Sequence, residues 1–154
     1  MGGKHLAWPP FFVPVGEGLV SQPLPVGLHV DVVPSYERFA AWKRSYELVL
    51  AVYDATDAFP KNELYGLTSQ TRRAGFSIVA NIAEGSAKRG GREFARYLDI
   101  ALGSLTELEV ALRLARDRGY VTPERWGELE RLRNHAGVLT WRLYRSIRDG
   151  GRDP

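Results

Sequence analysis

The sequence predicts an all-α protein, in which an antiparallel up-down-up-down four-helix bundle follows an irregular, proline-rich N-terminal extension. Residues 1–34 hold six of the nine prolines and show no helical or strand periodicity. From Ser35 onward, apolar residues recur every three or four positions in four segments, which is the period of an amphipathic helix. The connections between these segments are only a few residues long, which favours antiparallel neighbours. We therefore expect an extension over residues 1–34 and one four-helix domain over residues 35–150.

The first helix is expected to begin with Ser35 as its N-cap and to end near Pro60, which cannot continue a helix. Two apolar lines run along different sides of it. The first is the main stripe and consists of Phe39, Trp42, Tyr46, Val49 and Tyr53. The second is surplus to one bundle and consists of Ala41, Leu48, Val52, Ala55 and Phe59.

The second helix is expected to run from about Glu63 or Leu67 to Glu84, with Gly85 as a left-handed C-terminal cap. Its inward residues are expected to be Leu67, Ala74, Ile78 and Ile82.

The third helix is expected from Gly91 to about Arg118, where Gly119 stops it. Its stripe has no interruption and consists of Phe94, Leu98, Ala101, Leu105, Leu108, Leu112 and Ala115. Thr122 is expected to cap the fourth helix, with Pro123 at its first position. The stripe of that helix is Leu129, Leu132, Ala136, Leu139, Leu143 and Ile147.

The third helix also carries a second apolar line, about half a turn away from the first. Its members are Ile100, Gly103, Val110 and Leu114. Because one bundle needs only one stripe per helix, the surplus predicts a homo-oligomer. The alternative is that long neighbouring side chains or the N-terminal extension shield these residues.

Composition narrows the classes of function. The chain has 154 residues and no cysteine, which excludes disulfides, thiolate nucleophiles and zinc fingers. Its net charge is +3, with residues 1–40 at −1 and the remainder at +4, and the basic residues are mainly arginine, whose planar guanidinium suits phosphate. A solvated surface or salt-bridged helices would explain the same charge. No apolar run is long enough to span a membrane, and prolines interrupt the apolar N-terminal stretch, so we expect a cytoplasmic protein without a membrane partner.

The corner between the second and third helices, NIAEGSAKRGGREF, gathers cations and glycines. A phosphate loop of the nucleoside-triphosphatase kind is excluded, because Lys88 precedes the glycine pair and no strand precedes either. A helix N-terminus flanked by cations can still attract an anion, whereas the alternative is a plain corner with solvated side chains. The candidate nucleic-acid-binding residues are Arg72, Arg73, Lys88, Arg89, Arg92 and Arg96.

A polar line runs along the second helix, formed by Gln70, Arg73, Ser77, Asn81 and Glu84. This polar line is consistent with a solvated face, a hydrogen-bonded seam between subunits or a surface that binds nucleic acid. The candidate residues of an oligomer or polar seam are Gln70, Ser77, Asn81, Glu84, Ile100, Val110 and Leu114. Histidines are scattered and no serine lies in a local catalytic motif, so we expect no enzyme, no metal and no cofactor.

The segment from about Trp42 to Ile147 resembles the bacterial four-helix bundle family of the 23S rRNA intervening-sequence proteins. The residues that carry the resemblance are Phe59-Pro60, Gly66-Leu67-Thr68-Ser69-Gln70, Arg72-Arg73-Ala74, Ser77-Ile78, Asn81-Ile82-Ala83-Glu84-Gly85, Glu93-Phe94, Ala101-Leu102-Gly103-Ser104-Leu105 and Glu107-Leu108-Glu109. The chain departs from the family pattern at Thr71, Gly75 and Val79-Ala80.

The resemblance implies a homopentamer inside a bacterial cell that is associated with RNA. The leading hypothesis is therefore a non-enzymatic oligomer that binds RNA through a basic surface. Two alternatives stay open. One is an accessory protein of a diversity-generating retroelement that binds RNA and a reverse transcriptase, and the other is a protein-recruiting scaffold without nucleic acid.

Overall fold

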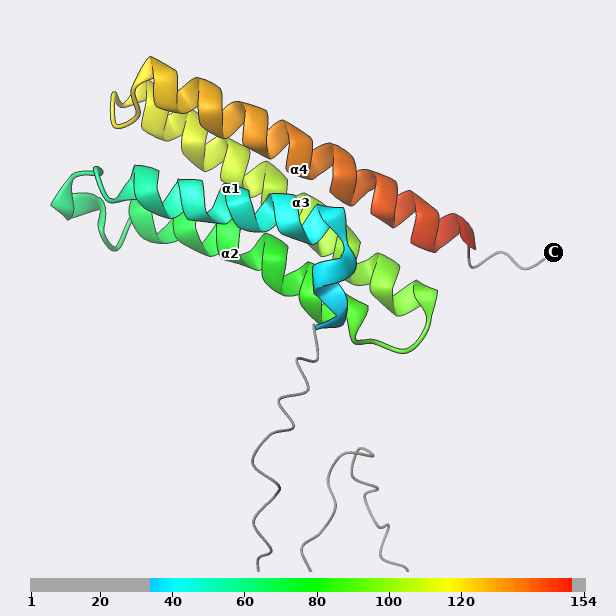
Figure 1. Ribbon diagram of the computed structural model, residues 1–154. Helices are drawn as coiled ribbons and strands as arrows, with labels where there is room; N and C mark the ends of the chain where they lie inside the picture. Colours follow the sequence, from blue (N-terminus) through cyan, green and yellow to red (C-terminus); the bar gives the residue numbers. More distant parts are fainter. Residues whose placement is uncertain (1–33, 151–154) are drawn as a thin grey trace, which may run out of the picture. The chain divides into compact units, whose positions relative to one another are not determined.

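The computed structural model describes residues 34–150, so the extension predicted over residues 1–34 lies outside the described residues apart from Pro34. Four α-helices and two short 3₁₀ turns make up the described part of the chain (Figure 1). The elements are η1 (Ser35–Arg38), α1 (Ala40–Thr56), η2 (Lys61–Glu63), α2 (Leu67–Ser86), α3 (Gly91–Asp117) and α4 (Pro123–Gly150).

The helices are arranged as a square. α1 packs on α2 and α4, and α3 packs on the same two helices, while no Cα atoms of the diagonal pairs come within 8 Å of each other in residues 34–150. The connections between consecutive helices are residues 57–66, which include η2, residues 87–90 and residues 118–122, and this is the predicted up-down bundle. None of the helices in this range combines the length and the apolar content needed to cross a bilayer.

Three segments that are distant in sequence meet at one end of the bundle. These are the start of α1, the α2–α3 turn and the end of α4, which lie on the same side in Figure 1. The hydroxyl oxygens of Ser35 and Ser86 are 3.3 Å apart. A Cβ atom added to Gly91 would lie 3.3 Å from the backbone oxygen of Ile147. The antiparallel order of the helices therefore decides which charges share this end.

The core follows the predicted stripes of α3 and α4. Every member of the α3 stripe, from Phe94 to Ala115, is buried. On α4, Leu129 and Ala136 are fully buried, and the other stripe residues pack partly buried against the core. Removal of these aliphatic side chains from water is the main stabilising contribution to the bundle.

The prediction for α1 was wrong, because the two apolar lines exchange roles. Ala41, Leu48, Val52, Ala55 and Phe59 form the buried line, so they are core residues of one chain rather than surplus. In the line predicted to be the main stripe, Val49 is buried and Phe39 and Trp42 are partly buried against the core. Tyr46 and Tyr53 remain 44% and 41% exposed. Small and aliphatic side chains let α1 approach α2 and α4 closely, and the larger tyrosines lie at the edge of the packed face.

Ser35 does not cap α1 as predicted. It begins the separate turn η1, and the extended backbone of Phe39, with ψ of 122°, interrupts the helical path before Ala40. The Ser35 hydroxyl lies beside Ser86 at the bundle end instead.

Gly85 is not a left-handed cap, because it lies inside α2, which continues to Ser86. A glycine is needed there for packing: an added Cβ would lie 2.7 Å from Cβ of Tyr97 and 2.8 Å from Cδ2 of Phe94 on α3. The positive φ angles near the helix ends belong to Gly90, at 91°, and Gly119, at 74°.

The predicted boundary between α3 and α4 is confirmed. The amide of Tyr120 donates to the carbonyl of Ala115, and the amide of Gly119 donates to that of Arg116, which is the Schellman pattern for a helix end. The Thr122 hydroxyl accepts a hydrogen bond of 3.3 Å from the amide of Arg125. This is the expected N-cap of α4.

Candidate nucleic-acid interface

The turn between α2 and α3 places its cations around one tyrosine. The ring of Tyr97 has Nζ of Lys88 at 5.2 Å and Cζ of Arg96 at 4.5 Å from its centroid. The Tyr97 hydroxyl donates a 2.7 Å hydrogen bond to Oε1 of Glu84, and Nζ of Lys88 lies 3.1 Å from the same oxygen. These contacts hold Lys88 and Arg96, which are both exposed, beside the Tyr97 ring.

The same contacts shift the protonation equilibria of the turn. The hydrogen bond from Tyr97, followed by that from Lys88, lowers the pKa of Glu84 below its usual value. The hydrogen bond to Glu84 raises the pKa of Lys88. Glu84 is therefore ionised and Lys88 protonated near neutral pH. Exposed ion pairs of this kind contribute little to stability, so a phosphate group can replace the carboxylate at small cost.

Arg89 and Arg92 differ from their neighbours. Both side chains are exposed, and neither has an ion pair or a side-chain hydrogen bond with another residue in the range 34–150. Gly90 lies between them with a positive φ and begins α3 without a side-chain cap. Arg73, on the far part of α2, is likewise exposed and unpaired in this range, but only Arg89 and Arg92 combine this with a place at the turn.

Arg72 and Arg73 do not lie at this turn. They precede Lys88 by 15 or 16 positions on α2, which separates them from it by roughly 24 Å along the helix axis. The Arg72 guanidinium donates to the Thr56 hydroxyl at 2.7 Å and to Oδ1 of Asp57 at 2.6 Å, so it links α2 to the end of α1. Arg73 is exposed beside a groove between α2 and α3.

The fold adds cations that were absent from the predicted set. We call the half of the bundle formed by residues 34–48, 77–104 and 137–150 the basic end. Its ten arginines and lysines are Arg38, Lys43, Arg44, Lys88, Arg89, Arg92, Arg96, Arg142, Arg145 and Arg148. Its six carboxylates are Glu37, Glu47, Glu84, Glu93, Asp99 and Asp149.

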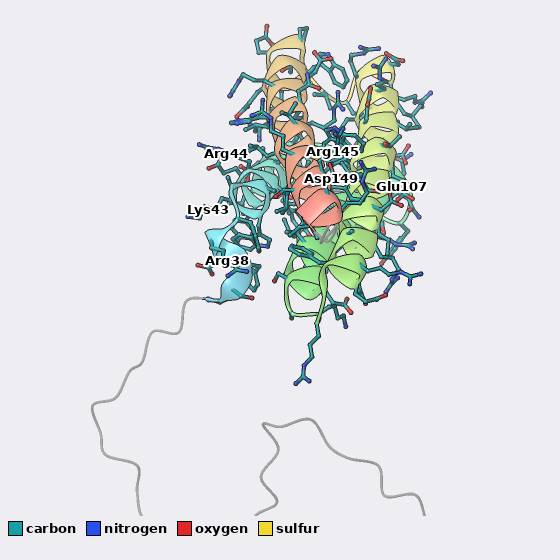
Figure 2. The ribbon with its side chains drawn as sticks, turned by 90° about the vertical axis from the view of Figure 1, so that its right-hand side faces the viewer. Arg38, Lys43, Arg44, Glu107, Arg145 and Asp149 are labelled. Atoms are coloured by element: carbon teal, nitrogen blue, oxygen red, sulfur yellow. The ribbon has the colours of Figure 1, made fainter. Side chains whose placement is uncertain are left out.

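Figure 2 looks at this end of the molecule and shows Arg38, Lys43 and Arg44 on the α1 side and Arg145 with Asp149 on α4. The other half, residues 49–76 and 105–136, balances nine cations with nine carboxylates. The antiparallel topology was the signal that could have found the missed residues, because it returns the end of α4 to the start of α3.

The polar line predicted on α2 is mostly an internal seam. The hydroxyls of Ser77 and Ser104 are 2.8 Å apart, which joins α2 to α3 within one chain. The Asn81 side chain donates to the backbone carbonyl of Ser77 at 2.7 Å. Gln70 lies further along, at the groove that Arg73 borders, and Glu84 belongs to the Tyr97 cluster.

The surplus apolar line of α3 remains at the surface of a single chain. Ile100, Val110 and Leu114 are exposed, and Val110 has the largest exposed fraction of the three, 63%. Val110 and Leu114 border the α2–α3 groove, whose volume is about 530 Å³. Among residues 34–150, no cluster of histidine and carboxylate side chains could hold a metal ion.

The fold and the sequence pattern both match known proteins. Residues 37–140 match the family model described as 23S rRNA-intervening sequence protein. A crystal structure from Bacteroides thetaiotaomicron VPI-5482, described as a protein with unknown function from the S23 ribosomal protein family, has a TM-score of 0.62 and 24% sequence identity. The match covers 68% of this chain and 97% of that chain, and it shows a shared fold. No curated protein matches the chain.

Proposed function

Because the chain belongs to the 23S rRNA-intervening sequence protein family, we propose that it is a non-enzymatic, homo-oligomeric protein that binds RNA through its basic end. The observation that carries this proposal is the excess of ten cations over six carboxylates in that half of the bundle. The opposite half has no such excess.

The available arginines suit the phosphate backbone. A guanidinium group presents donors in a planar fork that matches two phosphate oxygens, and Arg89 and Arg92 have no competing partner within residues 34–150. Contacts from arginine to the phosphate backbone are electrostatic, so binding through them falls steeply with salt.

Assembly would multiply this surface. The exposed line of Ile100, Val110 and Leu114, next to the α2–α3 groove, offers apolar area that a second copy can bury. We propose a homopentamer, the form that the family resemblance implies, and a bacterial cytoplasmic location where RNA is the partner. In a closed ring, each chain presents its basic end in an equivalent position.

The test compares two double variants that remove the same charge. In filter binding to a single-stranded RNA, Arg89→Ala with Arg92→Ala should lower the affinity and reduce the slope of log affinity against log salt by about 1.4 for the two lost phosphate contacts. Arg113→Ala with Arg116→Ala is the control, because both arginines are exposed, have the same spacing and lie in the opposite half. The control should change binding by less than twofold.

Equal losses in both double variants would show that net charge alone governs binding and would contradict an interface at the basic end. Wild-type protein that fails to bind RNA at low salt would contradict the proposal and favour the protein-recruiting scaffold. Light scattering on the same samples should give five times the 17.3 kDa mass of one chain. A single-chain mass would contradict the oligomer.

A further inference from the structure

A groove between α3 and α4 at the basic end combines aromatic rings with cations. One part of it, with a volume of about 420 Å³, is bordered by Arg92, Arg96, Asp99 and Tyr144. A second part of about 530 Å³ shares Asp99 and is bordered by Gly103, Gly137 and Trp141. Both parts lie along the same pair of helices and share Asp99, and we refer to them together as the α3–α4 channel.

The channel has a preformed stacking surface. The rings of Trp141 and Tyr144 are stacked, with centroids 5.4 Å apart and an interplanar angle of 25°. The Arg148 guanidinium carbon lies 5.4 Å from the Tyr144 centroid. Trp141 is 48% exposed, so this large apolar ring is available to a ligand.

Glycines on both helices leave room beside the indole. Neither Gly103 on α3 nor Gly137 on α4 has any neighbouring atom within 4 Å of an added Cβ. A planar group can therefore enter the channel next to Trp141 without moving the backbone.

The charges around the rings favour a polyanion over another apolar chain. Arg92 and Arg96 border the channel from α3, and Arg145 and Arg148 follow Trp141 on α4. Arg145 and Arg148 share one carboxylate, Asp149, at 3.2 and 3.0 Å, and Glu93 offsets Arg96 at 3.2 Å. Arg92 has no such partner among the described residues. Asp99, which borders both parts of the channel, partly offsets the excess of positive charge.

We propose that the α3–α4 channel binds a single-stranded segment of nucleic acid, with an unpaired base stacked on Trp141 and its flanking phosphates contacting Arg92, Arg145 and Arg148. Exposed aromatic rings next to a cationic groove are how proteins hold unpaired bases, because every base has a π face. A duplex keeps its bases stacked inside and cannot use the indole. The inference rests on the proposed RNA binding, and it adds that the bound nucleic acid is single-stranded.

The experiment measures fluorescence anisotropy of a labelled 12-nucleotide RNA and of the same sequence as a blunt duplex. Trp141→Ala should weaken single-strand binding about fivefold or more, which is the lower limit for loss of one stacked base. Duplex binding should change by less than twofold, and the salt slope should stay that of the wild type, since no phosphate contact is lost. Val138→Ala, which truncates another exposed apolar residue of α4, should leave both affinities unchanged.

A second measurement serves if Trp141→Ala fails to fold. The single-stranded RNA should quench tryptophan fluorescence of the wild type, and Trp141→Phe should lose most of that quenching while retaining part of the affinity.

Wild-type protein that binds no RNA would contradict the proposed function itself. Wild-type binding combined with full single-strand affinity in Trp141→Ala, or with unchanged quenching in Trp141→Phe, would overturn only the stacking site. A change in the light-scattering mass of Trp141→Ala would also overturn it and would show that this face joins two copies of the chain.

Discussion

The basic end and the opposite half of the bundle carry nearly equal numbers of arginines and lysines, but they use them differently. In the opposite half, three arginines connect different elements, namely Arg72, Arg125 and Arg133, whereas Arg113 and Arg116 pair within α3. Arg125 on α4 donates to the backbone carbonyl of Ala51 on α1 at 3.1 Å and lies 3.7 Å from Asp54. Arg133 on α4 pairs with Glu109 on α3 at 3.0 Å.

Every ion pair at the basic end joins residues that are four positions apart or fewer. The pairs are Arg44–Glu47, Lys88–Glu84, Arg96–Glu93, Arg145–Asp149 and Arg148–Asp149. None of them connects two helices. The difference teaches that similar numbers of cations can link helices in one half of a fold and remain available to a ligand in the other half.

The largest expected effect concerns the close packing of α2 against α3 at Gly85, since no ion pair at the basic end joins two helices. Gly85→Ala should lower the free energy of unfolding by about 1–3 kcal/mol, because the new Cβ overlaps with Cβ of Tyr97 and separates α2 from α3. Gly127→Ala in the opposite half is the control. It lies in the interior of α4 with no atom within 4 Å of an added Cβ, so it should raise stability by about 0.5–1 kcal/mol. Urea denaturation followed by circular dichroism measures both, and equal shifts would show that α2 and α3 do not approach closely at Gly85.

A smaller effect tests the contrast in the use of cations directly. Arg125→Gln should cost about 1 kcal/mol of stability, because it leaves the Ala51 carbonyl without the side-chain donor and breaks the link between α4 and α1. Arg89→Gln at the basic end should change stability by less than about 0.5 kcal/mol, since it removes no contact within residues 34–150. Thermal denaturation measures both variants. A larger loss of stability in Arg89→Gln than in Arg125→Gln would contradict the view that only the cations of the opposite half link helices.

The smallest effect is a shift in protonation at the α2–α3 turn. Tyr97→Phe removes the hydrogen bond that contributes most to the lowered pKa of Glu84, so that pKa should rise toward the usual value of a glutamate. The stabilisation from this group is present above the unfolded-state pKa and is lost as the pH falls through the lower folded-state pKa. In Tyr97→Phe, the stabilisation from ionised Glu84 should therefore be lost at a higher pH than in the wild type. An NMR titration of the Glu84 carboxyl carbon measures the change, and an unaltered midpoint would exclude Tyr97 as the donor.

Much of the fold was predictable because its signals are local. The uninterrupted stripe of α3 identified its buried residues, from Phe94 to Ala115, and the Gly119 and Thr122 positions identified the boundary with α4. The candidate site was predictable in part. Lys88, Arg89, Arg92 and Arg96 lie within nine residues of sequence, so the turn and the first two turns of α3 necessarily hold them near one another.

Other features depend on contacts between distant residues. Either apolar line of α1 could form the buried face of an amphipathic helix. Only the positions of α2 and α4 decide that the line of Leu48 and Val52 is the buried one. The conformation of Gly85 was misread because a glycine near a helix end fits both a cap and a close approach, and Tyr97 on the next helix decides between them.

The sequence by itself determined four amphipathic helices, their order and most of their ends, because helical period and capping act within a few residues. Only the tertiary structure decided which faces are buried, which arginines link helices and which cations of α1, α3 and α4 gather at one end. The physical reason is that periodicity fixes a side chain's direction on its own helix, whereas burial and charge density depend on what lies opposite it in space.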